Sequence, residues 1–127
     1  MKMDLITIYE NYMALNKNYI KFIEHLVETD FTDDEGQIRE ELEKAKVALE
    51  GLLRQSDEIK IDEENEHNVK DLSYLLADTL FLGIDLLGLY EYKELGRFKM
   101  RVINYTNKQK HVEVFGGMNA GNCRVVE

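Results

Sequence analysis

Three aspartates at seven-residue intervals, Asp71, Asp78 and Asp85, have the spacing in this chain that most suggests chemistry. Seven residues of an α-helix return to nearly the same face, with a drift of about 20°, so a helix would carry them as one acidic stripe. A carboxylate buried among their apolar neighbours must be paired, metal-bound or neutral, because burying a lone charge is very costly. For Asp78 and Asp85 we favour ion pairs with basic side chains or a hydrated seam. The alternatives are a divalent cation, tyrosine hydroxyls and contacts across a dimer.

Two short segments, Glu40–Glu43 (EELE) and Leu76–Phe81 (LADTLF), resemble the acidic helical motifs of the MazG-like nucleotide pyrophosphohydrolases. In that all-α family, clustered helical carboxylates hold magnesium against a nucleoside triphosphate. The resemblance therefore implies Mg²⁺ as a cofactor and a phosphohydrolase activity. The chain departs from the family pattern at Leu75, where the family has an acid three residues before the aspartate. The ligands that the resemblance implies are Asp78, Asp85, Glu40 and Glu43.

Other catalytic constellations are absent from the sequence. Ser56 and Ser73 lack the glycine-flanked setting of a nucleophile elbow. Cys123 has no histidine near it in the sequence. The chain contains no phosphate-binding Walker loop, no dinucleotide-binding glycine motif after a strand and no paired-cysteine motif. We therefore expect no resident cofactor, and Mg²⁺ enters only with the phosphohydrolase alternative.

Two amphipathic helices are predicted in the first half of the chain, because apolar residues recur there at alternating steps of three and four. The first covers residues 4–28 and has Asp4 as its N-cap. The second runs to about Gln55 and follows a capping box in which Thr32 and Glu35 satisfy each other's backbone donors. Both helices have one apolar face, so both are expected to pack in a bundle.

The third predicted helix, residues 66–90, is the most apolar part of the chain. From Leu72 to Tyr90 it contains no Lys, Arg, Glu, His, Asn or Gln. Two aspartates near its middle would each cost about 2.5–3.5 kcal/mol in a bilayer, so a soluble core is favoured over a membrane span. We expect a central helix that its own bundle covers on one side and a second subunit covers on another.

The segment after residue 91 fits two templates. Apolar residues from Leu95 onward keep the helical spacing, and Gly116 would supply a C-cap. Alternation within residues 97–115 also fits a β-hairpin. We favour the helix, because three long helices leave a slot that a fourth fills. Residues 1–115 are then one helical domain, and the Gly- and Asn-rich residues 116–127 are a mobile tail.

Composition narrows the function classes. The 127 residues suit one domain, and the net charge of −9 argues against nucleic-acid binding and anionic membrane surfaces. A basic segment, residues 93–110, has a local charge of +5 and leaves −14 elsewhere. We expect it to dock on the acidic helices rather than to face an anionic ligand. A single cysteine and the lack of a signal peptide at the start favour the cytoplasm.

The sequence thus predicts an all-α fold, an antiparallel bundle of three long helices and a shorter fourth. The leading functional hypothesis is an acidic, non-enzymatic protein that acts by protein–protein association. It would form a homodimer through the helix at residues 66–90, whose apolar surface exceeds what three neighbours would cover, or bind an unknown protein partner. The alternatives are a magnesium-dependent nucleotide pyrophosphohydrolase and an acidic mimic of nucleic acid.

Overall fold

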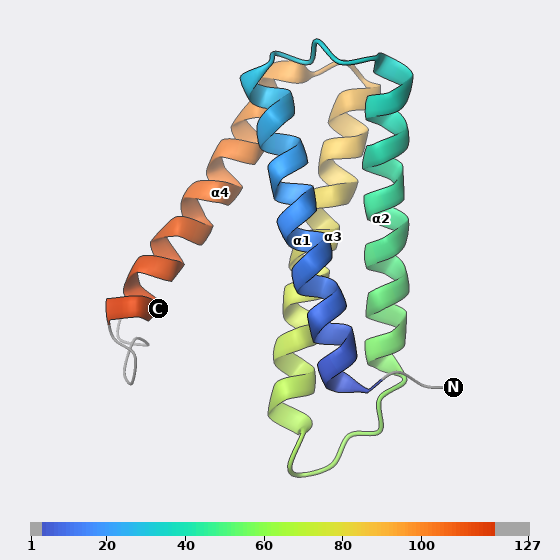
Figure 1. Cartoon of the computed structure of the whole chain (residues 1–127), viewed down its shortest axis with the longest axis vertical. Coiled ribbons are helices and arrows are strands. Elements are labelled where there is room, and N and C mark those ends of the chain that lie inside the picture. Colours follow the sequence, from blue (N-terminus) through green and yellow to red (C-terminus); the bar gives the residue numbers. More distant parts are fainter. Residues whose placement is uncertain (1–3, 119–127) are drawn as a thin grey trace.

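The computed structural model describes residues 4–118, with side chains as far as residue 108, and is all-α over that range (Figure 1). Its helices are α1 (Leu5–Glu28), α2 (Glu35–Asp57), α3 (Glu66–Glu91) and α4 (Leu95–Met118). The predicted helical bundle is confirmed, and a helix rather than a hairpin covers residues 97–115. From residue 119 onward, the predicted tail lies outside the described residues.

Helices α1, α2 and α3 form an antiparallel bundle, and α4 packs on it with its first half only. In Figure 1, α4 starts beside the end of α3 and then diverges, so that its C-terminal end stands apart from the other helices. Among the side chains of α4 that are described, which end at residue 108, the buried ones are Phe98, Val102 and Tyr105. The fourth helix is not shorter, as predicted, but has 24 residues. No proline interrupts it, and it continues past Gly116.

Two adjoining apolar clusters form the core, and α3 contributes to both. The larger one joins α1, α2 and α4 around Leu82 and Leu86, and includes an edge-on contact of Phe31 with Phe98 at a centroid distance of 5.0 Å. The smaller one joins α1 and α2 to the first half of α3 around Leu76. The buried residues of α3 recur at the three-four spacing of one helix face.

The connection between α1 and α2 begins α2 at a different cap from the one predicted. Asp30 and Phe31 have left-handed φ angles of 55° and 59°, and the Phe31 amide donates to the Leu26 carbonyl at 2.9 Å. Because this turn takes up the residues directly after α1, α2 begins further along the chain than the predicted cap implies. Its N-cap is Asp34, which accepts from the Gln37 amide at 3.0 Å. The predicted Thr32 capping box is therefore wrong, whereas Asp4 caps α1 as expected.

A tight turn joins α3 to α4. Lys93 has a left-handed φ of 59°, and the Glu94 amide donates to the Leu89 carbonyl at 2.8 Å. This pattern closes the C-terminus of a helix and usually places glycine at the left-handed position. After this turn, α4 runs back along α3. The side chains of α4 determine over what length the two helices stay in contact.

Candidate association surface

The aspartates of the seven-residue stripe lie on the exposed side of α3. The Asp85 carboxylate accepts from Arg101 Nε at 3.0 Å, so the favoured ion pair is present for this residue. Asp71 is 3.2 Å from His67 Nε2. Asp78 is exposed and makes no ion pair with a residue whose side chain is described. None of these carboxylates is therefore buried without a partner, which was the arrangement that the sequence suggested for a functional site.

The four residues of the implied magnesium site lie on two helices. Glu40 and Glu43 are exposed on α2, whereas Asp78 and Asp85 are on the part of α3 that faces α4. Within the described residues, no Cα atom of α2 lies within 8 Å of a Cα atom of α4. Among the same residues, no group of three or more His, Cys, Asp or Glu side chains has a metal-binding arrangement.

A chain of hydroxyl groups ties α1, α3 and α4 together inside the bundle. Tyr12 Oη and Thr79 Oγ1 are 2.9 Å apart, and Thr79 Oγ1 is 3.3 Å from Tyr105 Oη. Burial raises the pKa of Tyr12 and Tyr105 above the usual value near 10.0. Both hydroxyls are therefore neutral at ordinary pH. They position α4 and offer no base for catalysis.

The hydroxyl group of Tyr19 is also buried and lies close to these three hydroxyl groups. Tyr19 Oη is buried and has no hydrogen-bond partner among the described residues. Burial raises the pKa of Tyr19 strongly, so it too stays protonated. In the sequence, Tyr12, Tyr19 and Tyr105 fall at the helical spacing of apolar residues, which gives no sign of a hydroxyl network. Thr79, a polar residue inside an apolar stripe, was the one signal that could have located the network.

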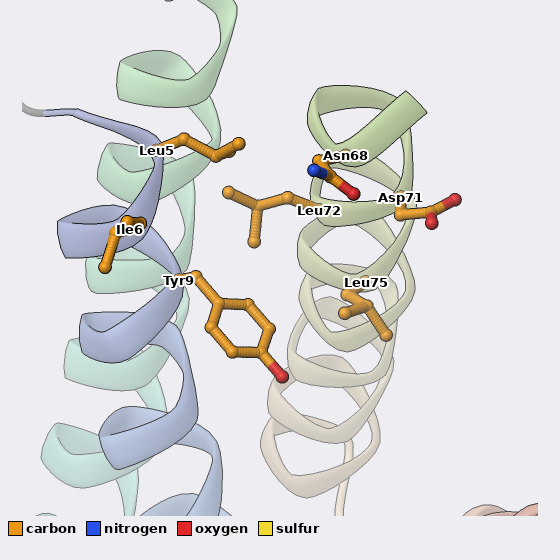
Figure 2. A pocket seen from close by; sticks show the side chains of 7 residues that line it. All are labelled: Leu5, Ile6, Tyr9, Asn68, Asp71, Leu72 and Leu75. Atoms are coloured by element: carbon orange, nitrogen blue, oxygen red, sulfur yellow. The ribbon is translucent and has the colours of Figure 1, made fainter. Parts of the chain in front are cut away.

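A groove opens between α1 and α3 beyond the point where α4 diverges. Its volume is about 420 Å³. Figure 2 shows side chains of α1 and α3 facing each other across it. On α3 the groove residues precede Thr79, which is where Tyr105 makes its contact. The open groove is thus the continuation of the surface that α4 covers. The residues that line it are Leu5, Ile6, Tyr9, Asn68, Asp71, Leu72 and Leu75.

The outward side of α3 carries a second apolar surface, here called the outer stripe. Phe81, in the middle of the helix, is 61% exposed, and Tyr74 and Ile84 are 75% and 42% exposed. Two small residues, Ala77 and Gly88, complete the three-four spacing. The excess apolar surface predicted for this helix is therefore present in the folded chain. The outer stripe consists of Tyr74, Ala77, Phe81, Ile84 and Gly88.

The same helix meets the length and composition of a membrane span. Among the described residues, α3 is the one helix with this property, and 44% of its most apolar window is buried inside the bundle. Comparison of the chain with family models, with curated proteins and with solved structures finds no match. The functional reading therefore depends on the surfaces and contacts of the chain itself.

Proposed function

We propose that this protein acts by self-association, as a homodimer whose subunits meet through the outer stripe of α3. The observation that carries this proposal is the exposure of Phe81, an aromatic side chain in the middle of the most apolar helix. Aromatic side chains contribute much of the binding energy at protein interfaces. A contiguous apolar surface that the fold leaves open marks an interaction site more often than a scatter of single residues does.

A comparison with α2 supports the choice of surface. On α2 the one large apolar side chain that is strongly exposed is Val47, at 58%, and its helical neighbours three and four residues away are charged, polar or small. On α3 the exposed large apolar residues recur with helical spacing and form one surface. Isolated exposed residues such as Val47 are ordinary for soluble proteins, whereas the outer stripe is not.

The expected strength of the contact follows from the exposed area. Fully burying a Phe side chain is worth about 1.5–3 kcal/mol, and Phe81 still has 61% of its surface to bury. Each copy therefore gains about 1–2 kcal/mol from this residue alone in a dimer. Because a two-fold dimer contains the residue twice, replacing Phe81 by a charged side chain should weaken association by more than about a hundredfold.

Sedimentation equilibrium tests the proposal with Phe81→Glu and a matched control, Val47→Glu. Both substitutions add a carboxylate to a strongly exposed helix position, but only the first lies in the outer stripe. The wild type and Val47→Glu should be dimers at micromolar concentration, and Phe81→Glu should be a folded monomer with an unchanged helical spectrum. A monomeric wild type, or a dimer that Phe81→Glu leaves intact, contradicts the proposal.

The magnesium-dependent phosphohydrolase remains the alternative, and the same samples test it. Thermal unfolding is measured with Mg²⁺, with Mn²⁺ and with nucleoside triphosphates. Under the proposal, none of these ligands changes the midpoint, and Asp78→Asn changes nothing beyond stability. A ligand-dependent rise that Asp78→Asn abolishes would favour the enzyme.

A further inference from the structure

We propose that the two copies pair through α3 in an antiparallel arrangement, about a two-fold axis that passes near Phe81. This inference rests on the proposed function and adds the orientation and register of the two helices. It follows from three kinds of complementarity that one register provides together: charge at the ends of α3, shape along the outer stripe, and charge along the edge next to α4.

The outer stripe is extended at each end by a charged residue. Counting backward from Phe81 in steps of four, three and four gives Ala77, Tyr74 and Lys70. Counting forward in steps of three, four and three reaches Glu91. Lys70 lies eleven residues before Phe81, and Glu91 lies ten residues after it. A two-fold axis near Phe81 therefore brings Lys70 of each copy to the partner's Glu91.

Glu91 has an unfavourable setting within its own chain. It lies in the last turn of α3, where a carboxylate faces the negative end of the helix dipole, and that turn contains no basic residue. Glu91 is exposed and makes no ion pair with a residue whose side chain is described. Lys70 pairs with Glu66 at 3.0 Å, and both side chains are more than half exposed, so the amine can also reach a partner. A parallel pairing would instead bring Glu91 to the partner's Glu91, which is repulsive.

The shapes along the stripe agree with the same register. Tyr74 meets the partner's Gly88, and Ala77 meets the partner's Ile84, so a large side chain faces a small residue in the layers on both sides of Phe81. Gly88 has open space where a side chain would project, because no atom lies within 4 Å of a Cβ built there. The space beside Gly88 is thus available for the partner's Tyr74. A bulky side chain at Gly88 would fill it without disturbing the single chain.

The edge of α3 next to α4 supplies the third complementarity. Asp78 and Asp85 share this edge, and in an antiparallel pair the edge of one copy meets the same edge of the other. Asp78 is then opposite the partner's Asp85. Arg101 would compensate these like charges, because its Nε is 3.0 Å from the Asp85 carboxylate and its side chain is one-third exposed. Arg101 would lie between its own Asp85 and the partner's Asp78, which makes no ion pair in the described part of its own chain.

A charge exchange tests the register by sedimentation equilibrium. Lys70→Glu and Glu91→Lys should each weaken the dimer by about tenfold, because each replaces two symmetry-related attractions by repulsions. The double variant should regain the wild-type affinity. A nonspecific effect of net charge would instead move the two single variants in opposite directions, because Lys70→Glu makes the chain more acidic and Glu91→Lys makes it less acidic. Single variants without effect, or a double variant as weak as the singles, overturn the inference. If Phe81→Glu still abolishes the dimer in that case, the proposed function stands and only the register fails.

Cross-linking tests the orientation independently. Tyr74→Cys and Gly88→Cys are made in a Cys123→Ser background and oxidised with oxidised glutathione, either alone or mixed. The antiparallel register expects disulfide-linked dimers in the mixture only, because Tyr74 meets the partner's Gly88. A parallel pair would cross-link each variant with itself, and that result overturns the inference. Gly88→Phe is a third arm and should abolish association without destabilising the monomer, because glycine is the weaker helix former. A wild-type monomer would overturn both the inference and the proposed function.

Discussion

Replacing Thr79 by valine removes one hydroxyl from the centre of the bundle and leaves the size of the side chain almost unchanged. Thr79 is 1% exposed, and its Oγ1 is 2.9 Å from Tyr12 Oη and 3.3 Å from Tyr105 Oη. Tyr12 is 2% exposed, so water cannot readily replace the lost partner. The substitution should therefore affect stability through hydrogen bonding and not through a cavity.

The magnitude follows from what each tyrosine loses. An orphaned buried polar group costs about 1–3 kcal/mol. Tyr12 loses its contact with Thr79 at 2.9 Å, whereas the contact of Tyr105 with Thr79, at 3.3 Å, is longer and therefore weaker. We therefore count one orphaned hydroxyl and expect Thr79→Val to lower the free energy of unfolding by about 2 kcal/mol. In the double variant with Tyr12→Phe, both partners of the shorter contact are removed, so the total loss should be about 1 kcal/mol smaller than the sum of the single losses.

Urea unfolding followed by far-ultraviolet circular dichroism measures these differences. All variants are made in the Phe81→Glu background, because association would otherwise add a concentration-dependent contribution to the stability. Thr79→Ser is the conservative control. It keeps the hydroxyl and loses only a methyl group, so its loss should be smaller than that of Thr79→Val. A Thr79→Val protein within about 0.5 kcal/mol of its parent, or strictly additive losses with Tyr12→Phe, would refute the hydroxyl network as a source of stability.

Two further expectations concern the turn after α3 and the buried tyrosines. Lys93→Gly should raise the free energy of unfolding by about 0.5–1 kcal/mol, because glycine adopts the left-handed φ of 59° without strain. Lys93→Ala keeps that strain and should not raise the free energy of unfolding. Equal urea midpoints for the two variants would contradict the argument. Burial raises the pKa of Tyr12, Tyr19 and Tyr105 above 10.0, the value in the unfolded chain. The contribution of these tyrosines to stability should therefore be constant below that pH and fall above it, where the unfolded tyrosines ionise first. In urea titrations across that range, Tyr19→Phe should make the decline shallower, and an unchanged decline would show that Tyr19 is not the buried group that the structure describes.

The sequence was sufficient for the helices because their signal is local. The residues that make the buried stripe of α3, such as Leu76 and Leu86, recur at the helical period, and no tertiary information is needed to detect that. The cap of α2 was missed for an equally local reason. Two consecutive left-handed residues, Asp30 and Phe31, close α1, and neither is a glycine that would have marked the closure. Side chains alone made Thr32 as good a candidate as Asp34.

The candidate site was less predictable because it depends on which neighbours a helix has. Asp78 and Asp85 looked buried, since nearly every residue around them is apolar. In the folded chain these carboxylates lie on the exposed edge of α3 next to α4, where Arg101 can reach one of them. The pairing was one of the expected outcomes, but its geometry needed the path of α4. In Figure 1, α4 diverges from the bundle, and the helical pattern of the sequence has no break that would indicate this.

The composition of α3 explains why the proposed association involves the same helix as the core. A helix with apolar residues all round cannot be satisfied by neighbours on one side, and here α1, α2 and the first half of α4 leave the outer stripe open. A helix needed only for the bundle would carry polar residues at the position of Phe81, at no cost to the core, because that side chain is largely exposed in the single chain. Folding therefore gives no reason for an aromatic residue there, whereas a second α3 does. The buried and outer stripes are separate sets of residues on opposite sides of one helix, so substitutions can weaken association without weakening the fold, and that separation makes the dimer hypothesis testable in solution.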